Sequence, residues 1–431
     1  MLLMPVLGES SSAEKRDLAE FPAFVEEGKL NPAFSEELDG WITDHFALRS
    51  ELITVNNLLK AGLFATSGEE KVIVGKNNWL YFSETAADYL GQNLLSDTDI
   101  AHLTTTLDLM DAYVGGQGGK LVFAVAPNKN TLYPGNMPVY YRRTDGETNL
   151  DRITRQLRER AYFADLRQAL EAAGEQTYHA RDSHWNNRGA MYAYHTLLDT
   201  AEKVHESYAG APWEWQRTWE GDLDAMIFPK LGFLDWQAVF NTEWTYRYTS
   251  RFHGEEDVLI TTENEAADGS LLVFRDSFAN ALLPFLAQSY ETAKFSRAIP
   301  YTLSEMETAR YDTVILEIAE RNLRNLLVSA PVMPAPQREP EREPAAVKAV
   351  VKARTVGDYR HYYGFLEEDV PAGAPVYLRL STGAGVRYVE AFPIYEAALL
   401  GSDGINSNGF SAYIPAEQCD GCQASVGIAA N

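Results

Sequence analysis

Cysteine is nearly absent from this sequence. Only Cys419 and Cys422 occur among 431 residues, and two thiolates cannot complete a tetrahedral zinc site without other ligands. A thioredoxin-like redox motif would need a βαβ context, whereas this pair lies near the end of a segment with strand-like patterning. We therefore expect either a local disulfide or two unreacted thiols. The scarcity of cysteine suits both the cytosol and a bacterial cell surface, so it assigns no compartment.

Long hydrophobic runs are also lacking. A helix needs about 20 apolar residues to cross a bilayer, and the apolar run from Met1 to Leu7 is much too short. No other run in the chain approaches the required length. We interpret residues 1–8 as the trailing end of a signal or anchor helix. The alternative is a frayed terminus.

Positive charge is in deficit. The chain has 37 Lys and Arg residues against 61 Asp and Glu residues, which gives a net charge of −24. This balance excludes a basic footprint for nucleic acid at the level of the whole chain. It also disfavours an anionic membrane surface as a partner for the bulk of the protein. The apolar fraction of 45% is ordinary for a soluble globular protein, and the length allows two or three domains.

What the sequence does contain is a set of short apolar stretches that do not alternate with polar residues. This pattern is typical of strands buried on both faces of a parallel sheet, and it occurs at 120–126, 271–274 and 311–319. A further short strand is expected at 176–179. Between them, apolar residues recur at helical spacing at 97–115, 149–173 and 187–208. The alternation predicts an α/β fold in which helices cover both faces of a parallel sheet.

Changes in composition divide the chain into four segments. A helical arm is expected at 1–70, followed by the α/β domain at 71–330, which opens with a hairpin at 72–82. Prolines and charges then gather at 331–350, as in a stiff extended linker. The remaining residues, 351–431, combine short strands with Gly- and Ser-rich turns and predict a small β-sandwich-like domain.

Ser277 is the candidate nucleophile. It follows the apolar stretch 271–274 in the motif Arg275-Asp-Ser-Phe278 and precedes small and apolar residues that start a helix. A serine at such a strand-to-helix turn is presented at the carboxyl edge of a parallel sheet, where active sites of open α/β sheets gather. Free backbone N–H groups at the turn can receive an oxyanion. The alternative is a polar turn after a core strand.

Asp182 and His184 are the candidate partners of that serine. They lie two residues apart, directly before the helix expected at 187–208. A nucleophilic serine needs a base to take its proton, and the base needs an acid to fix its tautomer. The alternative is that Asp182 caps the helix and His184 is a surface residue.

Further polar and aromatic residues are candidates for binding substrate or an oxyanion because they stand beside these motifs or after neighbouring strands. They are Asn128, Lys129, Tyr133, Arg275, Trp185 and Arg321. For Asn128, Lys129 and Tyr133, which follow the strand at 120–126, the alternative is that they are solvated loop residues. Residues 213–248 are rich in tryptophan, whose flat faces can stack on sugar rings, although tryptophan is equally a core residue.

Five motifs in this order resemble one known family. Gly75-Lys-Asn-Asn-Trp-Leu-Tyr-Phe82, Pro127-Asn-Lys129, Asp182-Ser-His-Trp185, Arg275-Asp-Ser-Phe278 and Glu320-Arg321 are similar to the alginate O-acetyltransferase-like SGNH family, which is also known by an Asp-His-His-Trp signature. The resemblance spans residues 15–325. The Asp/His pair precedes the serine, as in the circularly permuted acetyltransferase branch of the SGNH fold. Ser183 occupies the second signature position, and no carbohydrate-binding module matches the C-terminal β segment.

The resemblance implies a three-layer SGNH-hydrolase-like domain in a bacterial, extracytoplasmic enzyme at the cell surface or anchored to the membrane. It implies a Ser277–His184–Asp182 triad, a covalent acetyl-serine, and transfer to an envelope polysaccharide or exopolysaccharide. A membrane-bound O-acyltransferase would supply the acetyl groups, and neither a cofactor nor a metal is expected. Two alternatives stay open: a carbohydrate acetylesterase with the same triad, and a non-catalytic surface protein that binds glycans.

Overall fold

The computed structural model describes residues 19–429 except 27, 46–48, 65, 144–145, 369, 372, 383–384, 397–406 and 420–421. The apolar run at 1–8, interpreted from the sequence as an anchor remnant, therefore lies outside the described residues. Among the helices in the described part, none is both long and apolar enough to cross a membrane.

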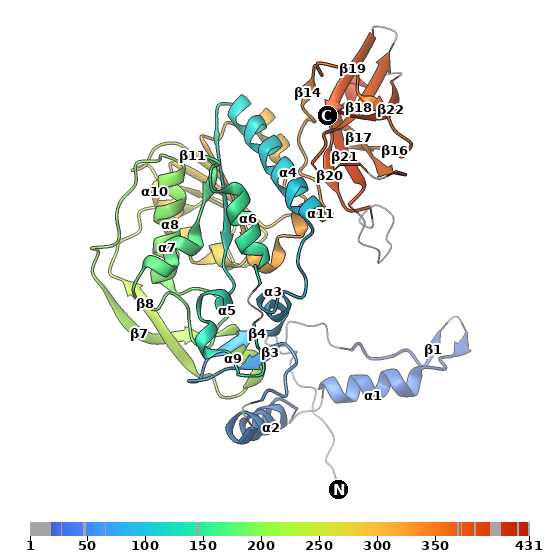
Figure 1. Ribbon diagram of the computed structural model, residues 1–431. Helices are drawn as coiled ribbons and strands as arrows, with labels where there is room; N and C mark the ends of the chain where they lie inside the picture. Colours follow the sequence, from blue (N-terminus) through green and yellow to red (C-terminus); the bar gives the residue numbers. More distant parts are fainter. Residues whose placement is uncertain are drawn as a thin grey trace.

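A seven-stranded mixed sheet forms the centre of the molecule (Figure 1). Its strand order is β6-β5-β13-β11-β12-β10-β9, in which β6 to β12 run parallel and β10 and β9 pair antiparallel. The three strands predicted from apolar stretches are confirmed and lie side by side in its centre. The bounds are β5 (Lys120–Ala126), β6 (Phe163–Ala164), β9 (Arg247–Tyr248), β10 (Leu259–Glu263), β11 (Ser270–Phe274), β12 (Thr292–Ser296) and β13 (Thr313–Ala319).

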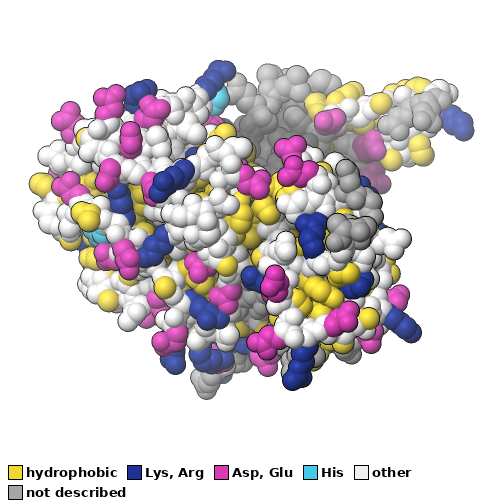
Figure 2. Space-filling model, turned by 90° about the horizontal axis from the view of Figure 1, so that it is seen from above, with side chains coloured by type: hydrophobic (Ala, Val, Ile, Leu, Met, Phe, Trp, Pro, Cys, Tyr) yellow, Lys and Arg dark blue, Asp and Glu magenta, His cyan; other side chains and the backbone are white. Residues whose placement is uncertain are grey.

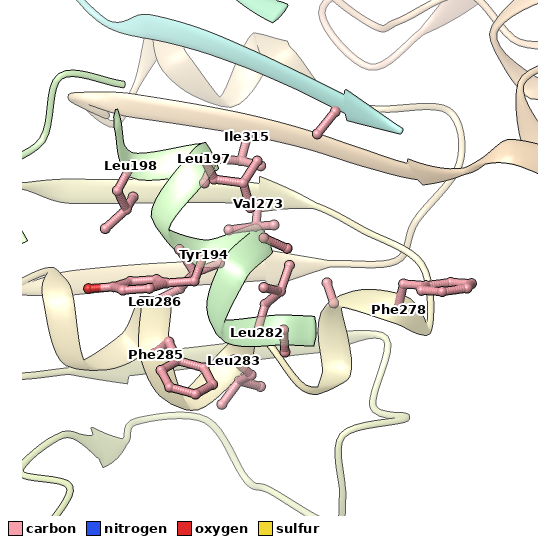
Figure 3. Close-up of a cluster of buried hydrophobic side chains, with 14 of the residues drawn as sticks. Tyr194, Leu197, Leu198, Val273, Phe278, Leu282, Leu283, Phe285, Leu286 and Ile315 are labelled. Carbon is pink, nitrogen blue, oxygen red and sulfur yellow. The ribbon is translucent and has the colours of Figure 1, made fainter. Parts of the chain in front are cut away.

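Helices cover both faces of this sheet, which confirms the three-layer α/β architecture. One face packs against α4 (Asp97–Gly116), α6 (Asn149–Leu157) and α11 (Asn325–Val328). The other packs against α7 (Leu166–Ala172), α8 (Asn187–Thr200) and α10 (Leu283–Ser289), and Figure 3 shows α8 and α10 side chains meeting β11 and β13. Successive residues of a strand point to opposite faces, so apolar side chains are needed on both, as in Leu121, Phe123 and Val125 against Val122, Ala124 and Ala126.

Two expected elements are different in the structure. The single helix predicted at 149–173 is broken, because residues 163–164 pair with β5 as an edge strand and Asp165 caps a new helix by accepting from the Gln168 N–H at 3.0 Å. The strand predicted at 176–179 is only an isolated bridge between Tyr178 and Trp185. This stretch belongs to a loop outside the central sheet. It is held by backbone hydrogen bonds between residues 177–179 and 184–186 and by side chains of other segments.

The N-terminal arm consists of β1 (Val25–Glu26), β2 (Lys29–Leu30), α1 (Phe34–His45) and α2 (Arg49–Phe64). Figure 1 shows α1 extending away from the body while α2 lies against it. The contact is made through α9 (Asp222–Ile227), where the Asn57 side chain donates to the Ile227 carbonyl at 2.7 Å. The hairpin predicted at 72–82 is present as β3 (Val72–Val74) and β4 (Leu80–Phe82).

Short helical turns and one long hairpin surround the carboxyl edge of the sheet. The hairpin pairs β7 (Trp213–Glu220) with β8 (Leu234–Phe240) and has a register shift between Arg217 and Trp219. The turns at this edge are η2 (Ser83–Thr85), α3 (Ala86–Tyr89), α5 (Lys129–Leu132), η3 (Pro134–Asn136), η4 (Phe278–Asn280) and η6 (Glu320–Asn322). A further turn, η5 (Leu303–Glu307), lies near the amino end of β5, where Met306 approaches Gly119.

The C-terminal segment forms two packed antiparallel sheets around a separate apolar core. Their orders are β14-β19-β18-β22-β15 and β16-β17-β21-β20. Residues 331–350, expected to be a linker, contribute β14 and β15 to one of these sheets. The bounds are β14 (Gln337–Arg338), β15 (Ala345–Ala346), β16 (Ala349–Val356), β17 (Tyr359–Leu366), β18 (Val376–Thr382), β19 (Gly385–Glu390), β20 (Phe392–Ile394), β21 (Gly409–Pro415), η7 (Ala416–Gln418) and β22 (Gln423–Ile428).

The C-terminal sheets are joined to the α/β body through a shared core. Phe392, Ile394 and Tyr395 are buried in the same cluster as side chains of α4 and α11, at the junction visible in Figure 1. Acidic and basic side chains are interspersed over the face seen in Figure 2, without a broad basic patch among the described residues there.

Candidate active site

Ser277 lies on the turn between β11 and η4, at the carboxyl edge of the sheet. The turn is held by the carboxylate of Asp276, which accepts from the Phe278 N–H at 3.0 Å and from the Ala319 N–H at 2.7 Å. Asn322 donates a third hydrogen bond to it at 3.1 Å. The serine is therefore fixed by its own loop and by the loop after the neighbouring strand β13.

The loop between α7 and α8 brings a histidine and an aspartate to this turn. His184 Nε2 lies 2.8 Å from Ser277 Oγ, although the two residues are 93 positions apart. On the other side of the ring, His184 Nδ1 lies 2.7 Å from Asp182 Oδ1. The structure thus brings together the three residues that the sequence suggested, in the hydrogen-bonded order serine, histidine, aspartate.

The charge distribution suits a proton acceptor beside the serine. Burial disfavours a charged His184, but the Asp182 carboxylate and then Asp222 outweigh it, so the pKa of His184 is raised. Burial opposes the charge of Asp182 as well, yet the His184 charge and hydrogen bond hold the pKa of Asp182 well below its usual range. The aspartate is accordingly ionised at neutral pH.

Two residues that the sequence analysis did not single out complete the surroundings of the aspartate. Asp182 Oδ2 accepts from the Trp219 indole N–H and from the Asp222 backbone N–H, both at 2.9 Å. With Oδ1 on the histidine, the carboxylate is fully engaged. These contacts fix its orientation and hence that of the ring.

Asp222 is a second carboxylate near the imidazole. It accepts from the Ser183 hydroxyl at 2.7 Å and from the Ser183 N–H at 2.8 Å, and its Oδ2 lies 3.9 Å from His184 Nδ1. The sequence gave no signal for Asp222 beyond its place in the tryptophan-rich segment 213–248. Gly221 is required there, because a Cβ atom would lie 2.3 Å from the Arg181 carbonyl oxygen.

Asp182, His184 and Asp222 could also be considered as metal ligands, since three of their ligand atoms lie within 4.8 Å of one another. The hydrogen bonds of Asp182 from Trp219 and the Asp222 backbone, and those of Asp222 from Ser183, already use both carboxylates. Donors pointing at the carboxylates fit an anionic triad better than a cation site.

Lys129 lies beneath the loop between α7 and α8, which we call the histidine loop because it carries His184. Its buried ammonium donates to the carbonyl oxygens of His179, Ala180 and Asp182 at 2.9, 2.9 and 2.7 Å, and it lies 5.0 Å from the centre of the Trp79 ring. Burial lowers the pKa of Lys129 to about 7, while three carbonyl acceptors need all three N–H groups of the charged form. From the sequence, Lys129 was a candidate for contacting substrate or an oxyanion. In the structure, its ammonium instead supports the histidine loop.

Three other candidate residues are also engaged by the protein. Trp185 is buried and donates to the Phe278 carbonyl at 2.9 Å, which anchors the serine turn. The buried Arg275 donates to the carbonyls of Glu255 and Asp257 at 2.7 and 3.1 Å. Tyr133 hydrogen-bonds Thr177 through its hydroxyl, and its ring lines a hollow of about 670 Å³.

Ser277 and Arg321 keep donors available for a substrate. Within the described residues, the Ser277 backbone N–H has no hydrogen-bond partner. The Arg321 guanidinium likewise has no hydrogen bond there and lies over the rings of Phe82 and Phe278, 5.6 Å from each centre. Asn128 is less free, because its side-chain amide donates to Asp88 at 3.2 Å and its backbone N–H to Glu320 at 2.8 Å.

Comparisons with known proteins concern the family and the fold. Residues 72–264 match the family described as "SGNH hydrolase-like domain, acetyltransferase AlgX". This match confirms the resemblance inferred from the motifs; it covers Asp182 and His184 and ends before Ser277. A relative named "Probable alginate O-acetylase AlgJ" from Pseudomonas syringae pv. tomato is 27% identical over 185 residues, which are 42% of this chain and 46% of the relative. The chain thus matches less than half the length of that relative.

Solved structures give more distant similarities. PatB1 of Bacillus cereus, solved with a sulfonyl adduct, is 17% identical at a TM-score of 0.45, covering 58% of this chain and 97% of its own. A DHHW family protein from Eubacterium siraeum is 17% identical at a TM-score of 0.43, with coverages of 58% and 94%. The O-acetyltransferase domain of Pseudomonas putida AlgJ is 18% identical at a TM-score of 0.40, with coverages of 58% and 91%.

Proposed function

We propose that this protein is an O-acetyltransferase that acetylates an extracytoplasmic bacterial polysaccharide through an acetyl-serine on Ser277. The observation that carries the proposal is the hydrogen-bonded series Ser277 Oγ, His184 Nε2, His184 Nδ1 and Asp182 Oδ1, with contacts of 2.8 and 2.7 Å. The match of residues 72–264 to an acetyltransferase family supports the choice of acyl group.

In the first half of the reaction, His184 Nε2 takes the proton of Ser277 while Oγ attacks the acetyl carbonyl. The negative charge that develops on the carbonyl oxygen is received by the Ser277 N–H, and Arg321 is close enough to the serine turn to assist. Losing one donor of this kind raises the barrier by about 3 kcal/mol. The imidazolium then returns its proton to the leaving group as the bond to the donor breaks.

In the second half, a sugar hydroxyl replaces the leaving group. His184, neutral again, takes the hydroxyl proton while the oxygen attacks the acetyl-serine, and the proton passes to Ser277 as the ester of the sugar leaves. The same geometry would serve water, so the acceptor alone separates the transferase from an acetylesterase. In the same proposal, a membrane-bound O-acyltransferase supplies acetyl groups on the outer side of the cytoplasmic membrane.

Ser277→Ala tests the nucleophile. Turnover of a chromogenic acetyl ester should fall at least about 10⁴-fold, because removing a member of such a triad leaves only binding and oxyanion stabilisation. The matched control is Ser270→Ala at the opposite end of β11, where the hydroxyl bonds Asp312; this variant should retain full turnover. If Ser277→Ala kept wild-type turnover, the proposed mechanism would be wrong.

Adding polysaccharide acceptors tests the reaction class. For a transferase, mass spectrometry should detect acetylated sugar, and ester consumption should accelerate with acceptor concentration. Free acetate as the sole product under all acceptors tested would make the protein an esterase. If the unaltered protein does not turn over the ester at all, the result would favour the alternative of a non-catalytic protein that binds glycans.

A further inference from the structure

The hairpin β7–β8 leaves two large aromatic side chains in solvent. Trp215 is 40% exposed and Trp236 is 52% exposed. Neighbouring residues of the same hairpin face the protein and hold the histidine loop: Trp219 donates to Asp182, and Asp235 accepts from the Arg181 N–H at 2.7 Å. The hairpin is therefore fixed to the candidate active site on one side. On the other side, Trp215 packs edge-on to Trp213 at 5.3 Å between ring centres, yet both Trp215 and Trp236 keep much of their indole surface in solvent.

The exposed tryptophans line one of two adjoining hollows. Trp215 and Trp236 form a hollow of about 420 Å³ together with Glu175 and Gln176. The hollow of about 670 Å³ that contains Tyr133 is lined by the same Glu175 and Gln176, and also by Trp79. Because they share two lining residues, the hollows lie side by side. We call the pair the trough; Trp215 and Trp236 line one hollow, and Tyr133 and Trp79 line the other.

The composition of the trough fits a sugar chain. Flat aromatic faces stack on the C–H faces of pyranose rings, and amide and carboxylate side chains bond the hydroxyls at the ring edges. Asn77, Asn136 and Gln176 provide amides along the larger hollow. Asn77 donates to Asn136 at 3.0 Å and Gln176 donates to the Tyr178 carbonyl at 2.7 Å, which leaves each amide with further donor or acceptor capacity. A purely apolar partner would bury that remaining capacity unused, at a cost of about 1–3 kcal/mol for each group left unsatisfied.

The charge of the trough decides between classes of glycan. Among the described residues, the charged side chains that line it are Glu171 and Glu175, and no Lys or Arg of that part of the chain lines either hollow. Glu175 is paired with Arg188 at 2.7 Å, so the remaining negative charge of the lining is that of Glu171. A sugar with a carboxylate would be repelled by Glu171, by about 1 kcal/mol for two charges about 4 Å apart in water.

We propose that this trough binds a glycan whose sugars carry no carboxylate, neutral or amino sugars, and not a polyuronate such as alginate. Binding itself stands on the geometry of the trough, whereas its role as the acceptor site rests on the function proposed above. The acceptor would then differ from the polymer in the name of the AlgJ relative.

Titration calorimetry on the Ser277→Ala protein, which cannot turn over, tests the binding. The probes are three hexamers, of β-1,4-linked glucose, of glucosamine and of mannuronate. Glucose or glucosamine hexamer should bind at least about tenfold more tightly than mannuronate hexamer. Trp215→Ala and Trp236→Ala should each weaken that binding about tenfold, with unchanged melting temperatures.

Two matched variants complete the experiment. Tyr140→Ala removes another exposed aromatic, 62% accessible and outside the trough lining, and should leave binding unchanged. Glu171→Lys should strengthen binding of the mannuronate hexamer several-fold. The inference is overturned if no hexamer binds, if mannuronate binds as tightly as the other two, or if the tryptophan variants bind like the parent. Ester turnover by the wild-type protein is measured separately, so failure of the catalytic proposal would leave these results interpretable.

Discussion

At the scale of single residues, the candidate site depends on how a few polar side chains restrain one imidazole. Asp182 contacts the ring directly, and Trp219 and the Asp222 N–H orient Asp182. Asp222 adds a second negative charge that reaches the ring through space and through the Ser183 hydroxyl. Trp219 and Asp222 act through Asp182 and His184, so they are positioning residues rather than members of the proposed triad.

Asp222→Asn should shift the pH profile of turnover. Asp222 is among the causes that raise the pKa of His184, and a base must be neutral to accept the serine proton. Removing the charge lowers the pKa of His184, so the acid limb of kcat should move to lower pH. The loss in kcat should be smaller than the roughly 10⁴-fold expected for Asp182→Asn.

The matched control for this experiment is Glu220→Gln, an exposed acid two positions away. Its acid limb should coincide with that of the wild type. If the acid limb of the kcat profile of Asp222→Asn coincided with that of the wild type, Asp222 would have no electrostatic effect on His184.

At the scale of elements, side chains tie together the loops that follow neighbouring strands. Asp276 after β11 accepts from the backbone N–H of Ala319, the last residue of β13. Glu320 after β13 accepts from the Asn128 N–H beyond β5 and from the Thr131 hydroxyl of α5. Each loop is thus held by the next strand along the sheet, so the serine turn is rigid although it is a loop.

Glu320→Gln should change how stability depends on pH. Burial raises the pKa of Glu320 from 4.5 to about 7, so between these values the folded state binds more protons than the unfolded chain. Wild-type stability must then fall as pH rises through this window. The amide does not titrate, so the variant should gain about 2 kcal/mol relative to wild type between pH 5 and pH 8.

Urea unfolding at several pH values measures this difference. Glu291→Gln, which replaces an exposed acid, serves as the control and should leave the slope unchanged. Parallel pH dependences for wild type and Glu320→Gln would contradict the assignment of a buried, protonated acid.

At the scale of the whole molecule, the C-terminal sheets have their own core, and one of their strands, β20, also contributes side chains to the core of the α/β body. Phe392 of β20 is fully buried against α4 and α11, and Ser407 donates to Asp99 of α4 at 2.8 Å. The two parts should therefore unfold together rather than as separate domains.

Phe392→Ala should lower the melting temperature of the entire protein. Truncating a buried phenylalanine costs about 3–5 kcal/mol, and the shared core distributes that cost to both parts. Calorimetry should show a single transition in the wild type and in the variant. Val386→Ala, at an exposed position of β19, should change little, and two transitions of which only one shifts would contradict the shared core.

Local patterns in the sequence determined the framework. Strands that are buried on both faces need apolar side chains at successive positions, and such a run can be recognised directly in the sequence. This is the pattern of residues 120–126, 271–274 and 311–319. The placement of Asp182, His184 and Ser277 at chain positions next to predicted helices and strands followed in the same way. The break at 158–165 was missed, because a two-residue edge strand leaves almost no periodic signal.

Tertiary structure alone decided which side chains meet. Trp219 and Asp222 reach Asp182 from 37 and 40 residues away, and nothing in a tryptophan-rich stretch says which indole turns inward. Lys129 looked like a substrate ligand after a strand, yet three carbonyls of a distant loop surround it. Sequence patterns show the periodicity and burial of residues within one helix or strand. Contacts between residues far apart in the sequence depend on how separate loops pack and on the directions in which their side chains point.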